Sequence, residues 1–152
     1  MTRLARRRDG ADRPLAATFR RNAAGFLEGA EAALPRHSEA TRYFLAIAIE
    51  LALKAYLLDR GLSDDWNRVN LRHDLAKTLR FARLAGFDGA PAGLPKLAAL
   101  LGPYYQVHGI SRMTPDEAAS VCWRQACTTV RELIAAVAET AGLAPSGQEN
   151  VA

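Results

Sequence analysis

Apolar residues recur every three or four positions along most of this chain, which is the spacing that places them on one face of an α-helix. Proline and glycine interrupt the pattern between these segments, and the alternation typical of β-strands is nearly absent. The pattern predicts an all-α fold, an up-and-down bundle of four to five helices. The expected helices cover residues 15–34, 39–60, 74–85, 96–105 and 114–140.

The second of these helices is apolar on every side. Between Tyr43 and Leu58, a stretch of sixteen residues, only Glu50 and Lys54 are charged. A helix without a polar face must be covered all round. We therefore expect it to lie at the centre of the bundle, or to meet a second subunit as well through an outward residue such as Leu53. The stretch is too short and too polar to span a bilayer.

Capping signals mark the third and the last helix. Asp74, or His73 before it, is expected to cap the third helix, and residues 62–72 are expected to form a polar loop. The last helix has the clearest start, because Thr114, a proline and Glu117 make a capping box. We expect this helix to continue without a break to about residue 140.

The two cysteines lie within that last helix in this prediction. Cys122 faces the core, and Cys127 is five residues further on. At this spacing the two side chains point about 140° apart, so a disulfide between them is excluded. No apolar segment typical of a secretory signal follows the basic start of the chain. These features favour a reduced, cytoplasmic location.

Composition is consistent with one small domain. The 152 residues are 49% hydrophobic and 24% charged, which is enough to bury a core without disulfides. The longest apolar runs stay below the 18 or so residues of a membrane span. The expected organisation is a flexible basic arm at residues 1–13, a helical bundle at 14–141 and a disordered tail at 142–152.

The net charge of +4 is distributed unevenly. Residues 1–21 carry seven arginines against two aspartates, whereas the remaining 131 residues carry 13 basic and 14 acidic side chains. The excess charge therefore belongs to the N-terminal arm, and the bundle is close to neutral. Two interpretations of the arm stay open: it binds nucleic-acid phosphates or an anionic surface, or it is a solvated, mobile terminus.

Two pairs of residues are candidates for chemistry. Glu50 and Lys54 are four residues apart in the favourable order for an ion pair. On so apolar a helix, they either form a partly buried pair that sets the helix register or face a ligand or partner. His73 and Asp74 either cap a helix together or place a titratable imidazole at a helix N-terminus, where anions bind.

A third cluster lies in and after the short fourth helix. Tyr104, Tyr105, His108 and Arg112 suit base stacking and phosphate contact, and they suit packing at the end of the bundle equally well. The chain has no HExxH, no CxxC and no neighbouring pair of histidines, so we expect no metal site and no cofactor. Phosphate-binding glycine loops and a GxSxG nucleophile elbow do not occur either.

Taken in order, several segments resemble HEPN-like domains. They are the AIELALKAYLL helix that contains Glu50 and Lys54, the junction from Gly61 to the HDL of His73, and an SRMTP loop before a long last helix. The resemblance covers about residues 15–140. It implies a small helical bundle that usually dimerises. Members of this family are partners of small nucleotidyltransferases, metal-independent RNases of toxin systems, or inactive binding modules.

The RNase members carry an arginine five to seven residues before a histidine, near the start of the last helix. In this chain only Arg68 and His73 have that spacing, they precede the third helix, and about one such match is expected by chance among 17 arginines. The last helix contains no histidine, and His108 and Arg112 near its start stand in reversed order. These departures favour a module without catalytic activity.

We therefore expect a HEPN-like module that is not catalytic and that binds nucleotide, RNA or a partner protein in a bacterial toxin–antitoxin or stress system, as a homodimer. One alternative is a metal-independent RNase that uses His108 and Arg112, or Arg68 and His73, to stabilise a cyclising phosphate and move protons. A second alternative is a purely structural interaction protein. The predicted ligand-binding residues are Glu50, Lys54, His73, Asp74, Tyr104, Tyr105 and Arg112.

Overall fold

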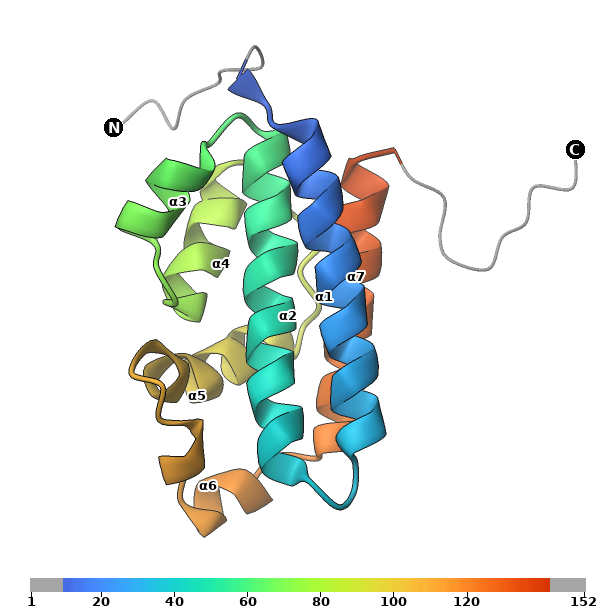
Figure 1. Ribbon diagram of the computed structural model, residues 1–152, viewed down its shortest axis with the longest axis vertical. Helices are drawn as coiled ribbons and strands as arrows, with labels where there is room; N and C mark the ends of the chain where they lie inside the picture. Colours follow the sequence, from blue (N-terminus) through green and yellow to red (C-terminus); the bar gives the residue numbers. More distant parts are fainter. Residues whose placement is uncertain (1–9, 143–152) are drawn as a thin grey trace, which may run out of the picture.

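Two long antiparallel helices, α1 (Arg13–Ala33) and α2 (Ser38–Asp59), lie side by side along the length of the structure (Figure 1). The computed structural model describes residues 10–142. After α2 the chain forms α3 (Asp64–Asn70), α4 (Leu75–Leu84), α5 (Leu94–Gln106), a 3-10 turn η2 (Ile110–Arg112), α6 (Pro115–Ala119) and α7 (Trp123–Thr140). These residues contain no strand, so the all-α class is confirmed for them.

The described residues contain seven α-helices, more than the four to five that the sequence predicts. The first four expected helices are present with ends within two residues of their predicted positions, and the fifth is interrupted near its start. Two short helices account for the difference: α3 lies in the segment expected to be a loop, and the last helix is divided into α6 and α7.

Helix α2 lies at the centre of the bundle, as predicted. It contacts α1, α3, α4, α5 and α7, and fourteen of its residues are buried. Leu53 is fully buried within the same chain, so the expectation that it points outward is wrong. Helices of the same chain cover most of α2, so the burial of fourteen of its residues does not require a second subunit, and the homodimer stays a prediction.

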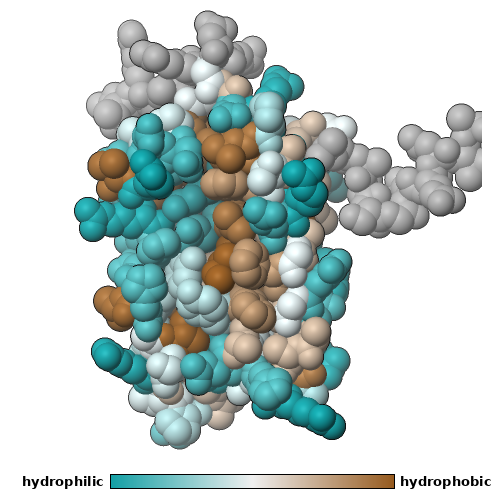
Figure 2. All heavy atoms as spheres, in the orientation of Figure 1, coloured by the Kyte–Doolittle hydropathy of each residue, from teal (hydrophilic) through white to brown (hydrophobic). Residues whose placement is uncertain are grey.

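Part of the surface over α1 and α2 remains apolar. Figure 2 shows apolar side chains along the face that these two helices form. The half-buried apolar residues that α1 and α2 contribute to the edge of the core include Phe19, Phe26, Phe44, Ile47 and Leu51. Within the part of the chain that the structure describes, no helix is long and apolar enough to cross a membrane.

Helix α3 forms because its N-terminus is capped. The Ser63 hydroxyl accepts a hydrogen bond from the backbone N–H of Trp66 at 3.0 Å, and two aspartates occupy the first turn, where the helix dipole favours negative charge. The Trp66 ring packs edge-on against Phe81 of α4, with ring centroids 5.5 Å apart. A seven-residue helix shows too little periodicity to be recognised from its apolar positions alone.

The last helix breaks after its capping box. Thr114 caps α6 as expected and accepts from the N–H of Glu117 at 3.2 Å. The indole N–H of Trp123 then donates to the carbonyl of Ala118 at 2.9 Å and occupies an acceptor that a continuous helix would use for its own N–H. Cys122 becomes the N-cap of α7 and is exposed, so its predicted position in the core is wrong.

The ends of the expected domain lie close to the boundaries of the described residues. Asp12 caps α1 by accepting from the N–H of Leu15 at 3.1 Å, so the bundle begins slightly earlier than residue 14. Residues 1–9 of the expected basic arm and residues 143–152 of the expected tail lie outside the described residues.

The break between α6 and α7 can be tested by thiol labelling. Cys122 is exposed, whereas Cys127 is 3% exposed and its burial raises the pKa of its thiol, which lowers the fraction of reactive thiolate. We expect an aromatic disulfide reagent to modify one thiol per folded chain rapidly and the second only in denaturant. The substitution Cys122→Ser should abolish the rapid phase. Two rapid phases, or none, would contradict the break.

The burial of α2 can be tested by placing a charge at a fully buried position and at a half-buried position of this helix. Leu53→Asp buries a carboxylate without a partner, and we expect it to lower the free energy of unfolding by about 4 kcal/mol or to prevent folding. Ile47→Asp, at a half-buried position of the same helix, should leave the chain folded with a smaller loss. Urea titrations followed by circular dichroism measure both, and equal losses would contradict this packing.

Candidate functional site

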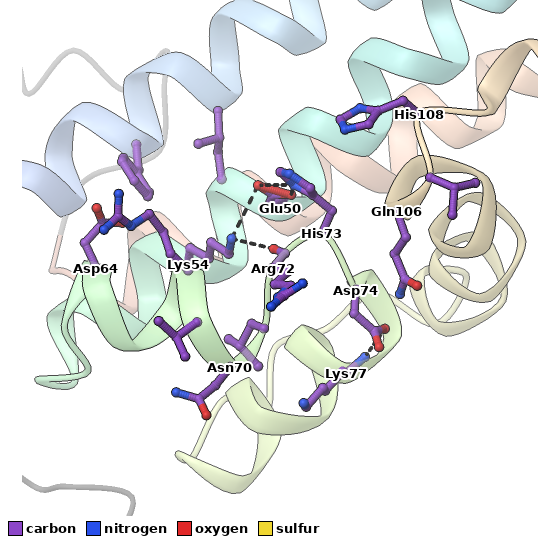
Figure 3. A pocket seen from close by; sticks show the side chains of 16 residues that line it. Glu50, Lys54, Asp64, Asn70, Arg72, His73, Asp74, Lys77, Gln106 and His108 are labelled. Atoms are coloured by element: carbon purple, nitrogen blue, oxygen red, sulfur yellow. Dashed lines mark hydrogen bonds and ion pairs between the residues drawn. The ribbon is translucent and has the colours of Figure 1, made fainter.

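A buried carboxylate on α2 organises the candidate site. Glu50 is 8% exposed and stands midway along a helix that is otherwise apolar on this stretch. Its carboxylate accepts from the Nζ of Lys54 at 3.4 Å and from the Nδ1 of His73 at 2.8 Å (Figure 3). Because a buried carboxylate is stable only when it is paired, Glu50 depends on both partners.

Lys54 joins α2 to the segment between α3 and α4. Besides its contact with Glu50, its Nζ donates to the backbone carbonyl of Arg72 at 2.7 Å, and its side chain is 7% exposed. The ammonium therefore has two acceptors inside the protein. The predicted ion pair is present in its partly buried form, and Lys54 acts by positioning the chain before His73.

His73 is held at one nitrogen and partly exposed. An ionised carboxylate only accepts hydrogen bonds, so the Nδ1 beside Glu50 carries the hydrogen, and Nε2 stays available to a ligand. The side chain of His73 is 43% exposed. Its ring lies edge-on to Tyr105, with centroids 5.2 Å apart, and to His108, at 5.8 Å. The arrangement orients one imidazole and places a second beside it.

The ring of Tyr105 packs edge-on against the ring of His73. Tyr105 is 5% exposed, and burial, together with the negative charge of Glu50 and a hydrogen bond to it, raises the pKa of the Tyr105 hydroxyl well above its usual value. The hydroxyl therefore stays neutral beside the carboxylate of Glu50. The Tyr105 ring also contacts Tyr43 edge-on, with centroids 6.0 Å apart.

Glu50, Lys54, His73 and His108 line an open cavity of about 1170 Å³, which we call the groove. Its walls come from α1, α2, α3, α4 and the end of α5 (Figure 3). The charged and titratable residues that line it are Glu50, Lys54, Asp64, Arg68, Arg72, His73, Asp74, Lys77 and His108.

Several of these charges are already paired. Glu50 and Lys54 satisfy each other, and Asp74 caps α4 by accepting from the N–H of Lys77 at 3.0 Å. Arg68 pairs with Asp65 at 2.7 Å on the exposed face of α3. Within residues 10–142, no ion pair engages the side chain of Arg72 or Lys77. The groove therefore offers two cations and two imidazoles to a ligand, beside the carboxylates of Asp64 and Asp74.

Two residues that line the groove have strained backbone conformations. Arg72 and His108, with φ of 48° and 53°, are the two residues other than glycine with positive φ in the described part of the chain, and both line the groove. Each such conformation costs about 1 kcal/mol or more and persists where the surrounding structure enforces it, often at functional sites. Here Lys54 holds the carbonyl of Arg72, and the N–H of the residue after His108 bonds the Tyr104 carbonyl at 2.7 Å.

The structure brings most of the predicted residues together. Those that line the groove are Glu50, Lys54, Arg68, His73, Asp74 and His108, and Tyr105 lies against Glu50 and His73. Asp74 is present as a helix cap, which is the first of the two interpretations offered for it.

Two predicted residues lie elsewhere. The Tyr104 hydroxyl donates to Glu117 of α6 at 2.6 Å, so it joins α5 to α6. Arg112 is exposed on η2 and does not line the groove. Arg68 reaches the groove, but its guanidinium pairs with Asp65.

Sequence reasoning missed Arg72 and Lys77, the two unpaired cations of the groove. Both stand within four residues of His73, and that proximity was the only signal in the sequence that could have indicated them. It also missed the contact between Glu50 and His73, which are 23 residues apart.

Comparisons with family models, with curated proteins and with solved structures find no match for this chain. Within residues 10–142, no three His, Cys, Asp or Glu side chains are grouped so that they could hold a metal ion.

The dependence of the site on Glu50 can be measured as stability. Glu50→Ala leaves the ammonium of Lys54 buried without its carboxylate, and we expect the free energy of unfolding to fall by about 3 to 5 kcal/mol. Asp65→Ala removes an exposed carboxylate from an ion pair and should cost less than about 1 kcal/mol. Chemical denaturation measures both, and a similar small loss in the two variants would contradict a central role for Glu50.

Proposed function

We propose that this protein is a helical module that binds the phosphate of a nucleotide or of RNA in this groove, called the phosphate groove below. The observation that carries the proposal is the fixed orientation of His73. Its Nδ1 is held by a buried carboxylate, its Nε2 is available, and a second imidazole lies beside it. When the His73 ring is protonated, Nε2 carries a hydrogen and can donate to a phosphate oxygen, which also accepts from the nearby cations.

Individual cations, rather than a net positive charge, support an anionic ligand. Once the ion pairs within the protein are set aside, Arg72 and Lys77 remain on the wall of the groove, together with the carboxylates of Asp64 and Asp74. A site with so few cations favours one or two phosphates, since each phosphate contact needs its own cation. We expect weak, salt-dependent binding of a short ligand.

The wider setting that we propose is the one that the HEPN-like resemblance implies. That resemblance rests on the sequence segments that contain Glu50, Lys54 and His73. In that setting, the module acts as a homodimer in a bacterial toxin–antitoxin or stress system, beside a small nucleotidyltransferase or on RNA.

Cleavage of RNA without a metal is the second candidate, and the juxtaposition of His73 and His108 favours it. In such a reaction, one imidazole takes the proton of the ribose 2′-hydroxyl, whose oxygen attacks the adjacent phosphorus. The other imidazole gives a proton to the departing 5′-oxygen. The products are a 2′,3′-cyclic phosphate and a 5′-hydroxyl. This pair replaces both arginine–histidine pairs considered from the sequence.

Binding can be tested with adenosine 5′-monophosphate by titration calorimetry or by NMR chemical shifts. We expect His73→Ala and Lys77→Ala each to weaken binding about tenfold, because each removes a hydrogen bond to a charged group. Arg112→Ala is the matched control, since it removes an exposed cation outside the groove and should leave the affinity unchanged. Failure of the wild-type chain to bind, or equal losses in all three variants, would overturn the proposal.

Cleavage can be tested by incubating the purified protein with RNA in EDTA, which removes metal-dependent contaminants. For a binding module we expect no products from the wild-type chain. Products with 2′,3′-cyclic phosphate ends that disappear in both His73→Ala and His108→Ala, but persist in Arg112→Ala, would establish the second candidate. Products that persist in both histidine variants would show a contaminating nuclease.

A further inference from the structure

A second cavity adjoins the phosphate groove, and His108 lines both. It has a volume of about 730 Å³ and lies against the turn between α1 and α2 and the start of α2. In Figure 3 the ring of His108 stands near the pair formed by Glu50 and His73, so this residue marks the boundary between the two cavities.

The second cavity differs from the phosphate groove in its chemistry. Aromatic rings line it, from Tyr43, Phe44, His37 and His108, and its polar groups include Glu39 and Ser111. Its formal charges balance, because Arg36 and Glu39 both line it. A flat, partly polar, uncharged group fits these walls better than a phosphate does, since every nucleobase has a face that stacks on aromatic rings.

A chain of aromatic contacts connects the two cavities. Tyr43 is 38% exposed, and its ring contacts Tyr105, which in turn contacts His73. The centroid distances along this path are 6.0 Å and 5.2 Å. A phosphate at His73 and a base on Tyr43 can therefore belong to one nucleotide or to adjacent nucleotides of one strand.

We propose that the second cavity is a nucleobase subsite, in which Tyr43 stacks on the base of the ligand whose phosphate lies at His73. This inference rests on the proposed function and adds the place where the base of the ligand binds and the residue that holds it. The polar edge groups Glu39 and Ser111 lie where they can hydrogen-bond the edge of the base.

The experiment compares adenosine 5′-monophosphate with ribose 5-phosphate, which has the same sugar phosphate and no base. Base stacking on an aromatic side chain is worth about 1 to 3 kcal/mol. We expect the nucleotide to bind the wild-type chain about tenfold more tightly than ribose 5-phosphate. Tyr43→Ala should abolish that difference while leaving the affinity for ribose 5-phosphate unchanged. Tyr43→Phe keeps the ring and should keep the preference.

Two comparisons separate failure of this inference from failure of the proposed function. If both probes bind the wild-type chain equally, or if Tyr43→Ala weakens both equally, the base subsite is refuted and phosphate binding stands. If neither probe binds, both proposals fail. His73→Ala should weaken both probes by a similar factor, because it acts on the phosphate. Thermal unfolding of each variant confirms that the exposed Tyr43 is dispensable for folding.

Discussion

Burial of the Glu50 carboxylate in an apolar helix is the constraint on which the site depends. A carboxylate at this depth would be strongly destabilising without partners. Lys54 supplies one partner from the same helix, and His73 supplies the other from the segment between α3 and α4. Because both partners are required, the segment around His73 is held against the middle of α2, and the wall of the phosphate groove follows from that attachment.

The same attachment links the polar residues of α2 to the segment before α4 and to α5. Lys54 contacts Glu50 and the carbonyl of Arg72, so it stabilises the positive φ of that residue. Tyr105, from α5, packs edge-on against His73. The pKa of its hydroxyl is raised, so the hydroxyl stays neutral beside Glu50. The residues left to face a ligand are therefore the ones that the cluster positions, His73 and its neighbours, rather than the residues that build it.

The path from Glu50 through His73 to His108 and Tyr43 joins two cavities of different character. The groove is lined by imidazoles and by charged side chains, including Arg72 and Lys77, and the adjoining cavity is lined mainly by aromatic rings. A nucleotide likewise joins a charged phosphate to an aromatic base. This correspondence between the two cavities and one ligand unites the proposed phosphate site and the proposed base subsite.

The amino-acid sequence by itself determined the helical class, the central place of α2 and the caps at Asp74 and Thr114, because these depend on local periodicity and on side chains within one turn. It also indicated Glu50, Lys54 and His73 as residues of interest. It did not reveal α3, whose seven residues are too few for a periodic pattern, or the break before α7, which depends on the Trp123 indole. Only the tertiary structure decided that Glu50 holds His73, that His108 lies beside it and that Arg112 does not. Those contacts join residues 23 or more positions apart, and local patterns carry no information about which distant side chains meet.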